Sequence, residues 1–356
     1  MLQLDNQTSW AAELYPGWGR NRKRQQTFVF KVGYTFDRLG QLSSLPQPPI
    51  ETADIYSGEP ETSSLVITNE IAPFKKGAEI LLTGKAYPSQ PGESIMRVEV
   101  GLRRGDKDYW NKELRVFGPR TWQRRILMVL PGKAGPITEP VKLTYENAYG
   151  GTDPANADEQ YLENPAGVGY SLRGLRTKAL TLPRIEIGPS FISSPAGRVQ
   201  PAGFGPLAPH WQPRCKEVVE IDTGMAACGG CPWAKEPPES LYNTAPLDQR
   251  FEQPFEGEMT LSLKGMVAGA PGGVLINLPA LHPKVLLEDG VTRGNITELL
   301  PRCDTLLVHT DKLQIFLLFR IAIPQEIKTN TPLMVHLIDL NTETEEANTE
   351  SMEAAI

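Results

Sequence analysis

Three cysteines and a histidine in the middle of the chain have the residue types of a metal site. His210, Cys215, Cys228 and Cys231 follow the spacing H-x4-C-x12-C-x2-C. Three thiolates and an imidazole suit tetrahedral zinc, but the spacing before Cys215 is not that of a standard zinc knuckle. A redox pair is disfavoured because no helical pattern follows Cys231. Packed thiols, a structural zinc with these four ligands and a redox pair all stay open, and packed thiols are favoured.

Two carboxylates lie close together in the segment YENAYGGTDP, residues 145–154. Glu146 and Asp153 flank a Gly-Gly pair and could supply the acid and the base of a hydrolase. The same residues favour a turn, because Asp precedes Pro and glycine accepts positive φ. Nothing in the sequence fixes the distance between the carboxylates. We therefore favour the turn and keep the hydrolase as the alternative.

The chain lacks the motifs that identify a nucleotide site or a familiar hydrolase. It has no phosphate-binding glycine loop, no G-x-S-x-G motif and no H-E-x-x-H motif. Its four histidines are His210, His282, His309 and His336, and none has a nucleophile spaced to partner it. The sequence therefore predicts no catalytic residues and no cofactor besides the possible zinc.

Composition and charge narrow the classes of function. The chain has 356 residues and a formal net charge of -6, so a broad nucleic-acid-binding surface is not expected. The N-terminus has no basic stretch followed by an apolar run, and the longest apolar run is broken by Arg320. We therefore expect a soluble cytoplasmic protein with reduced cysteines and with neither nucleic acid nor membrane as a partner.

Basic residues gather just before the first long apolar segment. Arg20, Arg22, Lys23 and Arg24 lie within five positions of one another. Such a cluster is either a solvated loop or a contact for an acidic protein surface. Both interpretations stay open from the sequence.

The elements that would position these residues are strands, because apolar residues alternate with a period of two. The alternating runs are residues 28–36, 79–87, 96–103, 113–118, 259–264, 313–323 and 332–340. The run 313–323 pairs with the preceding residues as a hairpin around Thr310-Asp311-Lys312. The best helix candidate is short, Ile296–Leu300. The pattern predicts an all-β or β-dominated chain with antiparallel sheets in sandwich or barrel-like packing.

Four regions follow from these patterns. Residues 1–150 form an N-terminal β region, and residues 258–340 form a C-terminal β region. Between them, residues 151–257 are rich in Pro and Gly, and we expect a largely irregular segment packed on the β framework. Residues 341–356 carry five glutamates and no basic residue, which is typical of a disordered acidic tail.

Several blocks of the chain resemble a known bacterial family. The most distinctive is PAGFGPLAPHWQPR, residues 201–214, and it comes with FGPRTWQRR, LTYENAYGGTDP, ENPAGVGY, LPRIE and YNTAPLDQR in order over about residues 8–325. Together they are similar to the family of uncharacterised-domain proteins encoded beside PAAR-tip, VgrG-spike and effector genes in type VI secretion clusters. The ACGGCPWA segment departs from the usual pattern of this family. The resemblance therefore implies that the cysteines belong to a subgroup of the family and not to the family as a whole.

The resemblance implies a non-enzymatic adaptor or chaperone. Such a protein binds a PAAR-containing effector in the cytoplasm and helps to load it on the VgrG spike. Phe204, Trp211 and Arg214 of the distinctive block are the candidate partner-binding residues, because rigid aromatic segments make good anchors. An internal clamp that locks the middle segment to the sheets is the other interpretation of the same residues. A zinc-stabilised structural component of the spike also stays open.

Overall fold

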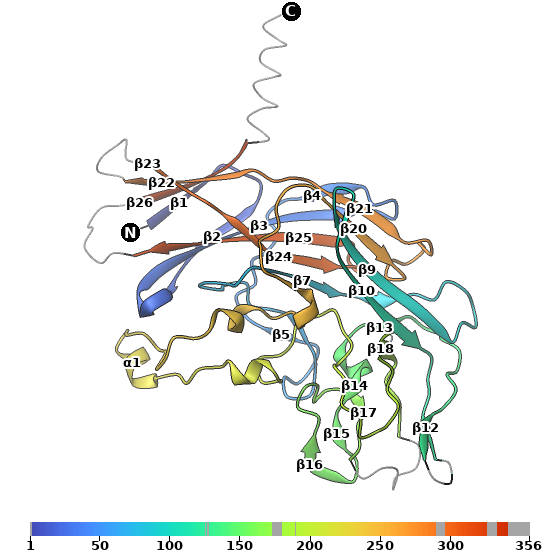
Figure 1. Ribbon diagram of the computed structural model, residues 1–356. Coiled ribbons are helices and arrows are strands. Elements are labelled where there is room, and N and C mark those ends of the chain that lie inside the picture. The colour runs from blue at the N-terminus through green and yellow to red at the C-terminus, as the bar shows by residue number, and fades with distance from the viewer. Residues whose placement is uncertain are drawn as a thin grey trace, which may run out of the picture.

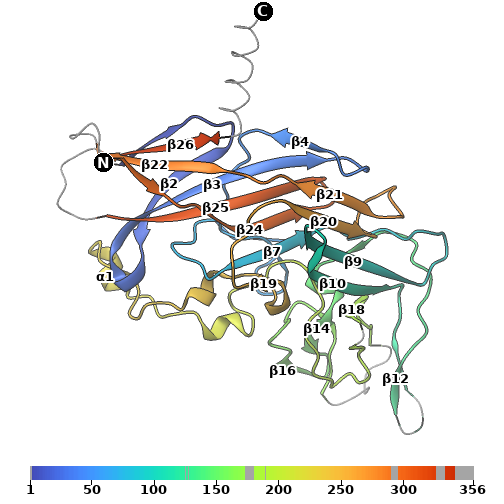
Figure 2. The same ribbon diagram turned by 45° about the horizontal axis from the view of Figure 1, so that its top comes forward.

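The computed structural model describes residues 2–124, 126, 128–172, 180–188, 190–289, 296–325 and 333–340. The chain is β-dominated, as its alternating apolar pattern predicts, and most strand pairs are antiparallel. Three sheets contribute to one large core, and the described strands form no closed barrel. Figures 1 and 2 show these sheets stacked in the upper part of the molecule, with the irregular segments below them.

The largest sheet combines strands from both ends of the chain. In order it contains β19 (Arg250–Phe251), β7 (Ala78–Thr83), β24 (Arg302–His309), β25 (Gln314–Pro324), β3 (Arg24–Phe36) and β2 (Ala11–Trp18), with β4 (Leu42–Leu45) also on β3. All these pairs are antiparallel except β7 with β24. The N-terminal and C-terminal β regions therefore share a sheet.

A second sheet lies beside it and also mixes the two regions. Its order is β18 (Ile185–Ile187), β10 (Lys107–Phe117), β9 (Ile95–Arg104), β20 (Met259–Lys264) and β21 (Val274–Leu278), all antiparallel. The third sheet is β1 (Leu2–Asn6), β26 (Leu333–Asp339), β22 (Pro283–Asp289) and β23 (Ile296–Leu299), in which β1 and β26 are parallel.

The predicted period of two places one face of each long strand in the core. Phe28, Phe30 and Val32 of β3 are buried there. Phe30 stacks on Phe319 of the neighbouring strand, with ring centroids 4.7 Å apart. The predicted hairpin is confirmed as β24 and β25. Leu313 belongs to the turn, with a φ of 54°, and not to the second strand.

The predicted helix at Ile296–Leu300 is wrong. Residues Ile296–Leu299 form β23, which pairs with β22 from Glu288 to Val285. A helix of five residues gains too few hydrogen bonds to offset its nucleation. As a strand, the same residues form backbone hydrogen bonds with the edge of β22.

The described part of the middle segment is irregular and packs on the sheets. It contains one helix, α1 (Thr223–Ala227), and 3-10 turns at Arg214–Lys216, Glu239–Tyr242 and Leu247–Gln249; two more lie at Arg20–Arg22 and Tyr145–Asn147. Short strand pairs complete the fold: β5 (Ile55–Tyr56) with β6 (Leu65–Ile67), β8 (Lys85–Ala86) with β13 (Val141–Lys142), β11 (Trp122–Arg124) with β12 (Val129–Pro131), β14 (Tyr149–Gly150) with β17 (Val168–Gly169), and β15 (Thr152–Asp153) with β16 (Asn156–Gln160). A small second core joins Trp122 to three tyrosines, Tyr149, Tyr161 and Tyr170.

The predicted acidic tail, residues 341–356, lies outside the described residues. Across the part of the chain that the structure describes, no helix combines the length and the apolar character needed to cross a membrane.

Candidate functional site

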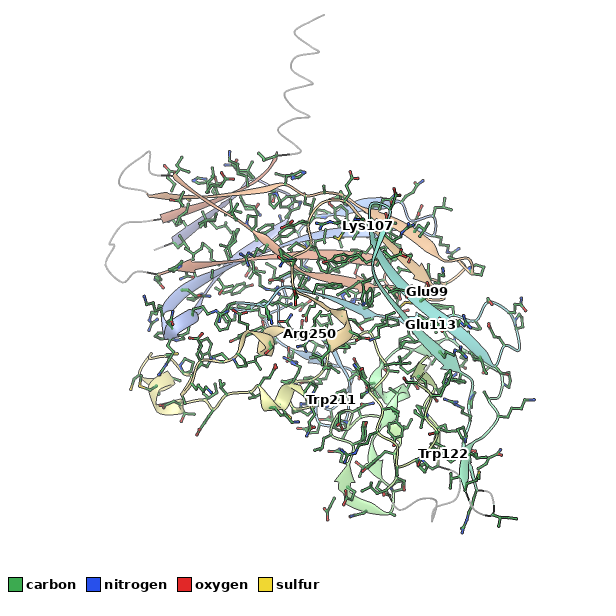
Figure 3. The ribbon with its side chains drawn as sticks, in the orientation of Figure 1. Glu99, Lys107, Glu113, Trp122, Trp211 and Arg250 are labelled. Atoms are coloured by element: carbon green, nitrogen blue, oxygen red, sulfur yellow. The ribbon has the colours of Figure 1, made fainter. Side chains whose placement is uncertain are left out.

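The three candidate anchors of the distinctive block lie inside the protein. Phe204 and Trp211 are 0% exposed and Arg214 is 6% exposed. The Phe204 carbonyl accepts a hydrogen bond of 3.1 Å from the Leu82 amide of β7, and Arg214 donates to the carbonyls of Leu207 and Leu241. This burial gives no support to the prediction that they bind a partner, and it favours the internal-clamp interpretation. Together they form an internal clamp, of which Trp211 is labelled near the centre of Figure 3.

The cysteines and His210 do not converge on one point. Cys228 is exposed at the end of α1, Cys231 is buried and Cys215 is partly buried. The His210 ring packs near the rings of Tyr56 and Trp211, and burial lowers its pKa. Among the described residues, no group of three or more His, Cys, Asp or Glu side chains is arranged to hold a metal ion. The zinc site stays a prediction without support from this geometry.

The basic cluster before β3 holds the cysteine segment in place. Arg24 donates to the Gly229 carbonyl between the two cysteines. Arg20 forms ion pairs with Glu236 and Glu239 just after them. Two members of the cluster, Arg20 and Arg24, thus bond the segment around Cys228 and Cys231 of the same chain.

The two carboxylates that suggested a hydrolase hold separate loops. Glu146 accepts hydrogen bonds from the Ser57 hydroxyl at 2.6 Å and from the Ser64 amide at 2.8 Å. Burial opposes ionisation of Glu146, but the hydrogen bonds outweigh it and lower its pKa to about 2. Asp153 accepts from the amides of Ala155 and Leu172. A general acid needs a raised pKa, so Glu146 is unsuited to that role.

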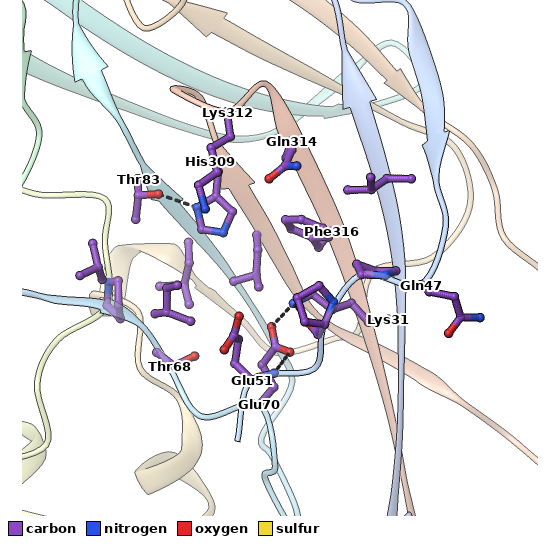
Figure 4. Close-up of a pocket in the computed structure, with 18 of the residues that line it drawn as sticks. Lys31, Gln47, Glu51, Thr68, Glu70, Thr83, His309, Lys312, Gln314 and Phe316 are labelled. Carbon is purple, nitrogen blue, oxygen red and sulfur yellow. Dashed lines mark hydrogen bonds and ion pairs between the residues drawn. The ribbon is translucent and has the colours of Figure 1, made fainter. Parts of the chain in front are cut away.

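The most enclosed concave feature that we describe lies on the face of the largest sheet that points away from the main core. We call it the sheet-face pocket, and its volume is about 320 Å³. Strand register places facing residues of neighbouring strands in rows across the sheet. One row is polar, with Thr83, His309 and Gln314, and the next row is apolar, with Leu81, Leu307 and Phe316. Figure 4 shows both rows lining the pocket.

A buried ion pair fixes the wall of this pocket. The Lys31 ammonium of β3 lies 2.7 Å from the Glu70 carboxylate and donates to the Pro49 carbonyl at 2.8 Å. The other Glu70 oxygen accepts from the Glu51 amide at 2.9 Å. Burial raises the pKa of Glu70, and the charge of Lys31 opposes that shift. The pair thus ties the proline-rich segment Pro46–Pro49 across the sheet.

His309 is a neutral imidazole at the polar end of the pocket. Its Nδ1 atom lies 2.6 Å from the Thr83 hydroxyl. Burial first, and then the positive charges of Lys312 and Lys31, lower its pKa to about 4. Sequence reasoning placed His309 on a strand and missed its surroundings. The signal available was Lys31, a charged residue in the middle of an apolar strand.

A second exposed feature is the hairpin of β11 and β12, which we call the arm. Its residues Ile126, Met128 and Leu130 are 99%, 56% and 42% exposed. Trp122 is buried at its base, where its indole donates to the Gly169 carbonyl. Figures 1 and 2 show the arm, labelled at β12, projecting away from the large sheets at the lower right. Exposed apolar side chains on a projecting hairpin are typical of contact surfaces.

Comparison with known proteins gives one match. A family model covers residues 21–320, and the family is described as uncharacterized protein conserved in bacteria (DUF2169). Neither a curated protein nor a solved structure matches the chain.

Proposed function

The chain belongs to the bacterial family DUF2169, and on this premise we propose that it is a non-enzymatic adaptor of the type VI secretion system. In this proposal it binds a PAAR-containing effector in the cytoplasm and assists its loading on the VgrG spike. The proposal rests on the sequence blocks quoted above, which resemble proteins encoded beside PAAR, VgrG and effector genes. The block 201–214 and its companions fall largely within the matched range 21–320.

The arm is the observation that best supports a binding role. Three apolar side chains there are exposed to solvent, which costs solubility without contributing to the core. Arg124 and Lys133 flank them, and residues 119–138 contain no Asp or Glu. In a chain of net charge -6, this is a local basic and apolar surface. It suits an acidic, partly apolar face of the client.

The rigid interior supports the same role. Phe204 joins the middle segment to β7 through the Leu82 amide, and Trp122 fixes the base of the arm in the small second core. A preformed surface loses less conformational entropy on binding than a mobile one. The hydrolase alternative has no observation in its favour, because Glu146 and Asp153 are engaged in loop hydrogen bonds.

Deletion of the gene tests the cellular role. The expected result is a lower level and lower secretion of the PAAR-containing effector of the same gene cluster, with VgrG secretion retained. Complementation with the wild-type gene should restore both. Unchanged effector stability and unchanged secretion in the deletion strain would overturn the adaptor proposal.

A further inference from the structure

The sheet-face pocket has two chemically different ends. His309, Lys312 and Gln314 lie at one end, and Glu51 and Glu70 lie at the other, with Phe316 between them (Figure 4). The floor between the ends is the apolar row of Leu81, Leu307 and Phe316. Its volume of about 320 Å³ is near the lower limit for small-molecule sites. An occupant must therefore be small, with an apolar body and one polar head.

The charges at the two ends differ in how they are engaged. Lys31 and Glu70 neutralise each other, and Lys31 also donates to the Pro49 carbonyl while Glu70 accepts from the Glu51 amide. Lys312 is exposed, and the described residues provide it with no ion pair. Its charge acts on His309, whose pKa it helps to lower. The end at His309 therefore carries a positive charge that no nearby carboxylate neutralises.

Several hydrogen-bond donors line the same end of the pocket. When the Thr83 hydroxyl donates to Nδ1 of His309, the proton of the neutral ring is on Nε2. The Gln314 amide and the Lys312 ammonium supply further donors at this end. A carboxylate accepts from several donors at once and is attracted by the ammonium charge. At the opposite end Glu51 would repel a second carboxylate.

We propose that the sheet-face pocket binds a carboxylate attached to an apolar group. Lys312, Gln314 and His309 would contact the carboxylate, and the Leu81, Leu307 and Phe316 row would contact the apolar group. Two sources share this chemistry, a free aromatic or aliphatic acid and the C-terminal residue of a polypeptide. The proposal goes beyond the adaptor function and does not depend on it.

Matched acid and amide probes test the recognition of the carboxylate. The free-acid pair is 3-phenylpropanoate and 3-phenylpropanamide, and the peptide pair is acetyl-Gly-Gly-Phe with a free or amidated C-terminus. Calorimetric titration of the full chain should show saturable binding of at least one acid, about tenfold tighter than its amide. Tighter binding of the peptide acid identifies a polypeptide C-terminus as the source, and tighter binding of 3-phenylpropanoate identifies a free acid.

Exposed lysines provide the matched variants. Lys312→Gln should weaken binding of the acid about tenfold and leave binding of the amide unchanged. Lys107→Gln removes the same charge at an exposed position outside the pocket lining and should leave both unchanged. A bound carboxylate should also raise the pKa of His309 in wild-type protein, measured by NMR of the ring. Equal binding of acid and amide, an unaffected Lys312→Gln variant, or no saturable binding at about 10 mM would overturn the proposal.

Discussion

At the scale of single residues, Lys31 shows how a polar group is kept inside a sheet protein. Its side chain is 5% exposed and that of Glu70 is 1% exposed. A buried ion pair contributes little over an apolar pair, but loss of one partner leaves an unpaired buried charge. We predict that Lys31→Met lowers the free energy of unfolding by about 3 to 5 kcal/mol, measured by urea denaturation.

The double variant separates charge from packing. Lys31→Met with Glu70→Gln removes both charges and keeps an oxygen for the Glu51 amide. It should therefore be more stable than Lys31→Met alone. A double variant that is as unstable as the sum of the two single variants would show that Lys31 and Glu70 act independently.

His336 links the stability of the third sheet to pH. Its Nδ1 lies 2.9 Å from Asp5 of β1, and its Nε2 lies 3.0 Å from Glu288 of β22. The hydrogen bond with Asp5 raises the pKa of His336, and the bond with Glu288 adds to this against the opposing effect of burial. A raised folded-state pKa stabilises the fold below the unfolded value of about 6.5. That contribution is lost as pH rises through the folded-state pKa.

The measurement compares wild type with His336→Gln. Wild type should be the more stable protein at about pH 5.5, and the difference should shrink at about pH 9, where the imidazole is neutral in both states. Urea denaturation at the two pH values gives both differences. A difference that grows toward high pH would contradict the assignment of an imidazolium between Asp5 and Glu288.

Trp211 tests whether the distinctive block is a clamp or an exposed anchor. A fully buried tryptophan leaves a large cavity when it is removed, so Trp211→Ala should cost about 3 to 5 kcal/mol of unfolding free energy. Tyr109→Ala, at a 38% exposed aromatic residue, is the control and should cost much less. A cost below about 1 kcal/mol at Trp211 would fit an exposed anchor instead.

At the scale of elements, the arm separates binding from folding. Met128→Ser with Leu130→Ser removes apolar groups that are 56% and 42% exposed, so unfolding should change by less than about 1 kcal/mol. Binding of the PAAR-containing effector should fall at least tenfold, because exposed apolar side chains supply contact energy. The matched control is Leu39→Ser, at a residue that is 78% exposed elsewhere.

Binding is measured by co-purification from cells that express the effector together with the wild-type chain, the arm variant or the Leu39 control. If the arm variant still binds the effector, the effector-binding surface lies on another part of the molecule. Loss of binding by the Leu39 control as well would show a general effect of lost apolar surface.

Long strands were predictable from sequence because each carries its own signal. In β3, Phe28, Phe30 and Val32 alternate along the chain and pack in the main core, although Val29 and Lys31 between them are buried as well. β23 has no such signal, because it is an exposed edge strand whose existence depends on β22. Local pattern predicts a strand only where one of its faces is buried.

The site was less predictable than the strands. His309 lies on β24 and Lys31 lies on β3, and β25 lies between these two strands in the sheet. The two residues are 278 positions apart in the chain. Register between distant strands is set by tertiary packing and is not present in local sequence. The block 201–214 could be identified from its sequence. The burial of Trp211 could not, because it depends on how the block packs in the folded protein.

At the scale of the whole molecule, strands from the two ends of the chain are interleaved. β3 and β7 pair with β25 and β24, and β9 pairs with β20. The irregular middle segment is clamped against this framework through Phe204 and Gln249, which bonds the Ile80 carbonyl. Such a framework supports the irregular middle segment through hydrogen bonds to the strands of the largest sheet.

The central claim is that this chain binds a PAAR-containing effector directly. The most direct measurement is co-expression of the tagged chain with the effector of its own gene cluster, followed by affinity purification and size-exclusion chromatography. The adaptor account predicts a stoichiometric complex that survives gel filtration, and an effector that is less soluble when expressed alone. An effector that is equally soluble alone and elutes separately from the chain would contradict the account.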